Sequence, residues 1–284
     1  MSESKEMEKL RLVTYLSPGI PVEIFETFMN YQEEVTGRDA YLIYESRWSG
    51  PPADRTDPFT ANEVDIAFME STDYLRLVKH NNKFIELCGV GPVHVHPKNT
   101  GRPVYYSDII INARNKLKYK ELHDLRGHTF GFSSRNSVSG SVVMLEQLKK
   151  LGQDASFFGK VYESGSHLAS IRSVLDSDVD VAAVDSNVLA GFLRSHPNFK
   201  DDLHVISSLG PLPTYAIVFN TRLSEKLQSQ ITKGFLGMTK SMKWNAQLQN
   251  HGISGFLPID SSHYDIEKDL KTAIGKLSMS STYY

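Results

Sequence analysis

The feature that most constrains the fold is a repeated alternation of short apolar stretches with amphipathic stretches along the 284 residues. Short apolar runs predict strands, and apolar positions that recur every three to four residues predict helices. Such alternation is typical of α/β proteins, in which helices cover a mostly parallel sheet. We expect strands at residues 10–16, 40–44, 64–68, 84–95, 104–112, 129–132, 157–162, 179–184 and 215–220, and helices at 22–34, 142–151, 167–176, 224–242 and 266–277.

Two segments rich in proline and glycine interrupt this alternation, His96–Pro103 and Ser207–Pro213. Each is interpreted as a crossing between domains. The sequence therefore predicts one discontinuous lobe of residues 1–103 plus 214–284 and a second lobe of residues 104–213. Ligands of such sheets bind beyond the carboxyl ends of the strands, so we expect a ligand cleft between the lobes.

Charge and composition exclude several classes of partner. Lysine and arginine total 31 against 33 aspartate and glutamate residues, and no basic run interleaved with aromatics is present, so we expect no binding to nucleic acid. Residues 1–9 are polar, and the apolar stretch after them is too short for a signal peptide or a membrane span. A single cysteine, Cys88, allows no internal disulfide. We therefore expect a cytoplasmic protein that is neither exported nor inserted in a membrane.

One stretch has the form of an anion site. The predicted strand at 129–132 leads into the turn Asn136-Ser-Val-Ser-Gly140, which opens directly onto a helix. Ser137 and Ser139 offer hydroxyl donors, and the first turn of a helix presents unpaired N–H groups with a partial positive charge. The alternative is that these residues only cap the helix, as serine and asparagine often do.

Four motifs, in their order and spacing, carry a resemblance to a known family. They are the turn at 136–140, Ser164-Gly-Ser-His167 before the next helix, Val179-Asp-Val-Ala-Ala-Val-Asp185, and the earlier Val64-Asp-Ile-Ala-Phe68. Together they resemble the PhnD-like phosphate- and phosphonate-binding branch of the type II periplasmic binding proteins, over about residues 10–236. The resemblance implies a two-lobed fold that binds a small oxyanion-bearing metabolite in the inter-lobe cleft by hinge closure.

The resemblance also implies roles for individual residues. It assigns Ser137, Ser139, the N–H of Val138 and His167 to the anion. The remaining ligand contacts that it implies are Trp48, Tyr105 or Tyr106, Phe68, Met69 and Asp185.

Two departures from the family pattern narrow the expectation. Family members that bind aminophosphonates hold the ammonium with two acids; Asp185 lies near the first position, but Pro213-Thr-Tyr215 supplies no acid at the second. An amine-bearing phosphonate is therefore not expected, and a phosphate ester, a simple oxyanion or a carboxylate remains open. The expected lack of an export signal argues against an ABC-transporter partner.

An enzyme on the same fold is the alternative, with His167 as general acid or base and Asp185 orienting it. No cofactor is expected. His94 and His96, with Cys88 nearby, lack a fourth ligand at a usual spacing, so we expect no metal site. Asp65 and Asp180 are expected to cap turns before buried strands.

Overall fold

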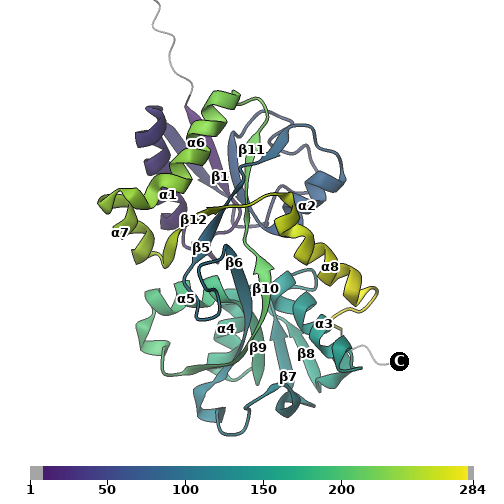
Figure 1. Ribbon diagram of the computed structural model, residues 1–284. Coiled ribbons are helices and arrows are strands. Elements are labelled where there is room, and N and C mark those ends of the chain that lie inside the picture. The colour runs from purple at the N-terminus through teal and green to yellow at the C-terminus, as the bar shows by residue number, and fades with distance from the viewer. Residues whose placement is uncertain (1–8, 281–284) are drawn as a thin grey trace, which may run out of the picture. The chain divides into compact units, whose positions relative to one another are not determined.

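The computed structural model describes residues 9–280, which divide into two compact units (Figure 1). Unit 1 contains residues 9–95, 100–103 and 214–263, and unit 2 contains residues 96–99, 104–213 and 264–280. The expected division placed the C-terminal segment in the first lobe. It belongs to unit 2 because helix α8 (Asp265–Ile274) packs on helix α3 (Val143–Lys150) of that unit.

Unit 1 is built on a five-stranded sheet in the order β2-β1-β3-β11-β4. Strand β1 is parallel to β2 and β3, whereas β11 runs antiparallel to β3 and β4. A separate two-stranded sheet pairs β12 with β5. The strands are β1 (Leu10–Thr14), β2 (Ala40–Tyr44), β3 (Ile66–Met69), β4 (Ile85–Leu87), β5 (Val90–His94), β11 (Ala216–Asn220) and β12 (Ile253–Pro258), and the helices are α1 (Val22–Thr36), α2 (Ser71–Lys79), α6 (Glu225–Gly237) and α7 (Met242–Asn250).

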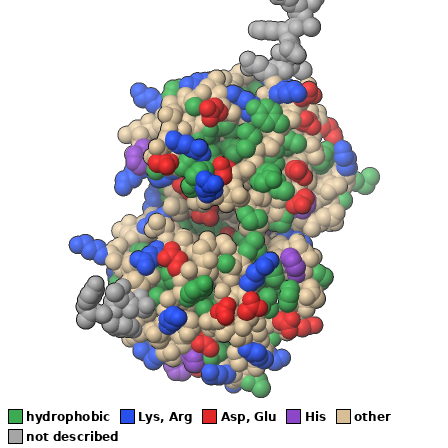
Figure 2. Space-filling model, turned by 180° about the vertical axis from the view of Figure 1, so that it is seen from behind, with side chains coloured by type: hydrophobic (Ala, Val, Ile, Leu, Met, Phe, Trp, Pro, Cys, Tyr) green, Lys and Arg blue, Asp and Glu red, His purple; other side chains and the backbone are tan. Residues whose placement is uncertain are grey.

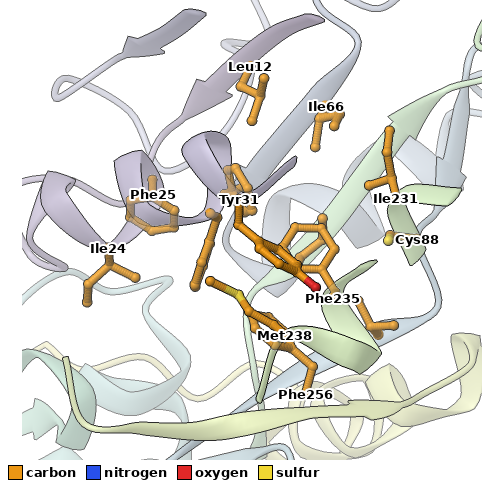
Figure 3. Packing of buried hydrophobic residues seen from close by; sticks show 14 of the residues in the cluster. Leu12, Ile24, Phe25, Tyr31, Ile66, Cys88, Ile231, Phe235, Met238 and Phe256 are labelled. Atoms are coloured by element: carbon orange, nitrogen blue, oxygen red, sulfur yellow. The ribbon is translucent and has the colours of Figure 1, made fainter. Parts of the chain in front are cut away.

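The core of unit 1 is rich in aromatic rings (Figure 3). The ring of Phe28, on α1, lies 5.8 Å from Phe68 and 5.2 Å from Phe256 between ring centroids. The sequence spacing of α1 explains this arrangement, because Ile24, Phe25 and Phe28 recur on one face of the helix and are fully buried. The core thus joins α1 to strands from distant parts of the chain.

Unit 2 has a second five-stranded sheet, in the order β10-β6-β9-β7-β8. Strand β7 is parallel to β8 and β9, and β6 runs antiparallel to β9 and β10. Both large sheets are therefore mixed rather than mostly parallel. The strands are β6 (Val104–Asn112), β7 (Thr129–Phe132), β8 (Lys160–Glu163), β9 (Val181–Asp185) and β10 (Leu203–Pro213), and the helices besides α3 and α8 are α4 (His167–Asp176) and α5 (Ser186–Ser195).

The clearest difference from the sequence interpretation lies at residues 207–213. This segment was expected to be an inter-domain crossing but forms the second half of β10, which pairs with β6 across two register shifts. Strand β10 is at the edge of its sheet, where proline is tolerated because its missing N–H faces away from the partner strand. Helix α2 and strand β12 were not predicted.

The surface carries both signs of charge. On the face shown in Figure 2, lysine and arginine side chains are interspersed with aspartate and glutamate, in keeping with the formal net charge of −2. Within residues 9–280, no helix has the length and apolar character needed to cross a bilayer.

Candidate anion-binding site

The candidate site lies at the carboxyl ends of two adjacent parallel strands of unit 2. Strands β7 and β9 pair in register through Phe130 with Val181 and Gly131 with Ala182. Both therefore end at the same edge of the sheet, where Ser133 follows β7 directly and Asp185 ends β9. Polar side chains that follow buried strands at this edge are placed for ligand contact by the sheet itself.

The serine turn after β7 opens onto α3 through a wide π-type turn. Residues Val138–Val142 form this turn, and Ser137 caps it, its Oγ accepting a hydrogen bond from the N–H of Gly140 at 3.0 Å. The hydroxyl of Ser141 is used internally, because its one hydrogen has three carbonyl acceptors within reach, those of Ser134, Arg135 and Ser137, the nearest being Arg135 at 2.7 Å. The expected capping is thus real at Ser137, and it leaves Ser139 free of a capping role.

Gly140 is required by the serine side chains around it. A Cβ atom at this position would lie 2.5 Å from the Oγ of Ser133 and 3.0 Å from the Oγ of Ser137. The structure shows that Gly140 leaves room for two hydroxyl groups of the site.

Three serine hydroxyls converge on one nitrogen of His167. The Nε2 atom lies 3.5 Å from the Oγ of Ser133, 3.4 Å from that of Ser137 and 3.3 Å from that of Ser139. All three serines are more than nine-tenths buried. We call Ser133, Ser137, Ser139 and His167 the serine cup.

The backbone fixes the proton on the His167 ring. The N–H of Asp185 donates to Nδ1 at 3.2 Å, so the neutral ring carries its hydrogen on Nε2, inside the cup. Burial lowers the pKa of His167 to about 4, which keeps the ring neutral near pH 7. The contact with Asp185 was expected through the carboxylate; it is made by the backbone instead, so no carboxylate orients this histidine as a general base.

The cup is a set of donors. Since Nε2 carries a hydrogen it cannot accept, and within residues 9–280 the hydroxyl hydrogens of Ser133, Ser137 and Ser139 have no acceptor. Three O–H groups and one N–H group are therefore available as donors around one ring nitrogen. Such an arrangement is complementary to the oxygens of a tetrahedral or planar oxyanion.

Asp185 contacts His167 through its backbone and caps helix α5 through its side chain. Its Oδ1 caps α5 by accepting from the N–H groups of Asn187 at 2.6 Å and Val188 at 3.3 Å. Burial raises the pKa of Asp185 to about 7, opposed by these two hydrogen bonds and reinforced by the charge of Asp108. The Asp108 carboxylate in turn lies 3.3 Å from the Nε2 of His96.

Other residues expected at the ligand lie in or near the core of unit 2. Val138 and Tyr105 are buried together against Leu212. Tyr106 is also buried; its ring stacks on His96 with centroids 4.7 Å apart, and its hydroxyl donates to the carbonyl of Lys98 at 2.8 Å. Direct ligand contact by Val138, Tyr105 and Tyr106 stays a prediction.

Three further expected residues belong to unit 1. Trp48 is partly exposed, and the guanidinium groups of Arg47 and Arg55 lie 5.4 Å and 4.8 Å from its ring centroid. Phe68 and Met69 end β3 with fully buried side chains, and Phe68 belongs to the aromatic core. Their contact with a ligand also stays a prediction.

Cys88, His94 and His96, which were considered for metal binding, have different surroundings. Cys88 is buried in the core of unit 1 with its Sγ 3.6 Å from the hydroxyl of Thr232, and burial raises the pKa of its thiol to about 12. His94 belongs to unit 1, whereas His96 belongs to unit 2 and pairs with an aspartate. In the described part of the chain, the side chains that come within reach of one ion are the largely exposed Glu121, His123 and Asp124.

The two aspartates expected to cap turns make different contacts. Asp65 forms an ion pair with Arg11, with 2.7 Å between Oδ1 and Nη2, and also accepts from the backbone N–H of Arg11. Asp180 accepts from the N–H of Thr129 at the start of β7, the end of the strand opposite to the cup.

Comparison with known proteins shows the family of the chain. Residues 12–264 match the family described as the periplasmic substrate-binding protein of the phosphonate ABC transporter. The chain belongs to this family. The phosphonates-binding periplasmic protein of Escherichia coli K12 is 28% identical over 200 residues, which are 69% of this chain and 56% of that protein, so the match spans just over half of its length. The expected family resemblance is confirmed.

Solved structures agree on the fold. A binding component of a phosphonate ABC transporter from Pseudomonas aeruginosa superimposes with a TM-score of 0.72 and 20% identity, covering 93% of this chain and 86% of that one. A PhnD protein of Prochlorococcus marinus, solved in complex with methylphosphonate, has a TM-score of 0.70 and 16% identity, covering 94% and 98% of the two chains. The fold expected from the sequence, that of the two-lobed binding proteins, is confirmed.

Ser133 is the member of the cup that the sequence interpretation missed. It follows the predicted strand at 129–132 directly, and a polar residue in that position was a usable signal. The sequence interpretation named only the serines of the following turn, Ser137 and Ser139.

Proposed function

We propose that this protein binds a small phosphorus oxyanion, of the phosphonate or phosphate-ester class, at the serine cup of unit 2. The observation that carries the proposal is the convergence of four hydrogen-bond donors with no acceptor for the hydroxyl hydrogens in the described structure. Family membership and the methylphosphonate bound by the relative from Prochlorococcus marinus support the choice of phosphonate as the first ligand to test.

Binding without turnover is the simpler use of these residues. A general base at Nε2 would need a free lone pair there, but Asp185 occupies Nδ1 and places the hydrogen on Nε2. The low pKa of His167 also makes protonation at neutral pH unfavourable. His167 and the serines therefore act as donors to one anion, and closure of the two units over it stays a prediction.

Calorimetric titration with methylphosphonate tests the proposal. We expect saturable binding with one site per chain, together with a rise in the melting temperature, because a ligand specific for the folded state adds roughly 2.7 kcal/mol at about a hundred times its Kd. A panel of phosphonates, phosphate esters and carboxylates that all leave the thermal transition unmoved would contradict the proposal.

The partner and the location are separate questions. The family description supports delivery of the ligand to an ABC transporter, whereas a single cysteine, Cys88, is compatible with a reducing compartment. We propose a cytoplasmic binding protein. Fractionation of cells that express the full-length gene product tests this, and recovery in the periplasmic or membrane fraction would contradict it.

A further inference from the structure

The serine cup has no cationic side chain. Within residues 9–280, the side-chain hydrogen bonds of its members join them to one another and to the N–H groups of Gly140 and Asp185. The guanidinium of Arg135, on the same turn, is directed to Glu163, with 3.3 Å between the charged atoms. The positive potential at the cup therefore comes from neutral donors and from the start of α3, which contributes about half a unit charge.

Negative charge lies close by. The carboxylate of Asp185 belongs to the residue whose N–H contacts the His167 ring, and its Oδ1 is held by two N–H groups of α5. Asp108, on the neighbouring β6, adds a second carboxylate that raises the pKa of Asp185, and it is paired with His96. Among the described residues, Asp108 is the charged group that acts on the Asp185 carboxyl, His96 is paired with Asp108, and the His167 ring of α4 contacts the backbone N–H of Asp185.

We propose that the serine cup selects oxyanions that carry one negative charge over those that carry two, and that Asp185 sets this selectivity. This inference rests on the proposed function. A buried anion must be matched by nearby positive charge or donors, and the cup offers enough for one charge but no lysine or arginine for a second. The ionised carboxylate of Asp185 repels a doubly charged ligand more strongly than a singly charged one. When protonated, the same carboxyl removes this repulsion and can also donate a hydrogen bond.

Methylphosphonate is a suitable probe, because a phosphoryl oxyanion passes from one charge to two near neutral pH. We expect its affinity for the wild-type protein to fall at least tenfold between about pH 6 and about pH 8.5, a loss of about 1.4 kcal/mol. Two ions with fixed charge separate the ligand's ionisation from that of the protein. At about pH 7, methanesulfonate, with one charge, is expected to bind at least about tenfold more tightly than sulfate, with two.

The variant Asp185→Asn isolates the contribution of the carboxylate. Asparagine caps a helix about as well as aspartate, so the start of α5 is preserved while the charge is removed. We expect the loss of methylphosphonate affinity with rising pH to shrink at least about threefold in this variant. Asp154→Asn is the matched control, since Asp154 is also an N-cap aspartate of unit 2 but caps a short turn after α3, and it should leave the pH profile unchanged.

The outcomes separate this inference from the proposed function. Methylphosphonate binding that is flat or strengthens with rising pH in the wild type would overturn the selectivity for one charge. A profile that weakens equally in Asp185→Asn and the wild type, with both proteins folded by circular dichroism, would overturn the role of Asp185. If neither methylphosphonate nor any other phosphonate or phosphate ester binds at any pH, the proposed function itself is wrong.

Discussion

Replacing one serine at a time separates ligand binding from helix capping. Among the described residues, the Oγ of Ser139 has one hydrogen-bond partner, the His167 Nε2, whereas the Oγ of Ser137 also accepts from the N–H of Gly140. Removing a hydrogen bond to a charged ligand costs about 1.5–3 kcal/mol. We therefore expect Ser139→Ala to bind methylphosphonate roughly ten- to hundredfold more weakly than the wild type.

The two variants should differ in stability. Loss of an N-cap costs about 1 kcal/mol, so Ser137→Ala should lower the free energy of unfolding by that amount as well as weakening the ligand. Ser139→Ala should leave the free energy of unfolding nearly unchanged, because its carbonyl contact with Ser107 is made by the backbone. Calorimetric titration and urea unfolding of both variants provide the measurement. Undiminished methylphosphonate binding in a folded Ser139→Ala protein would refute the cup as the anion site.

Four other experiments test the surrounding structure. Burial lowers the pKa of His167 to about 4, so the unfolded chain binds a proton at this histidine more readily than the folded chain does. The contribution of His167 to the free energy of unfolding should therefore fall as the pH drops from about 6.5 to about 4. Urea unfolding of His167→Gln should lack this part of the pH dependence. Asp185 has the opposite sign: its pKa of about 7 means that its contribution declines as the pH rises from about 4 to 7, and Asp185→Asn should remove that decline in the same assay. Cys88, with its raised pKa and its place in the core, should resist iodoacetamide until the protein is unfolded, and rapid labelling of the native protein would contradict the packing of unit 1. Phe68→Ala should lower the free energy of unfolding by about 3–5 kcal/mol, and a loss below about 1 kcal/mol in urea unfolding would contradict its place in the aromatic core.

Elements with strong local patterns were predictable from the sequence. Strands β2, β6 and β7 and helix α4 begin and end at the expected residues, because each is an apolar or periodic run bounded by polar or turn-forming residues. Helix α3 starts one residue later than expected, since the π-type turn at Val138–Val142 precedes it. No residue type specifies that turn, which depends on packing around Gly140.

Elements that depend on distant partners were not predictable. Strand β10 contains Gly210, Pro211 and Pro213, which indicate a loop when considered alone, and only its edge pairing with β6 makes it a strand. Strand β12 exists through its pairing with β5, more than a hundred residues earlier in the chain. The assignment of α8 to unit 2 likewise rests on its contacts with α3 and β10.

The candidate site also has features that the sequence indicates and features that only the structure shows. Ser137 and Ser139 were expected at the site because hydroxyl donors at a helix start are a recognisable pattern, and His167 was expected there through the family resemblance; their contact with a ligand stays a prediction. The link from Asp185 to the histidine was missed because it runs through a backbone N–H, which every residue except proline carries. Side-chain type therefore indicated the donors, while the proton position on His167 required the structure.

A crystal structure of the protein with methylphosphonate bound would test the central claim most directly. We expect phosphonate oxygens within about 2.5–3.0 Å of the hydroxyls of Ser133, Ser137 and Ser139, and one oxygen accepting from the His167 Nε2. A phosphonate bound elsewhere, with the hydroxyls of the serine cup making no contact to it, would contradict the account.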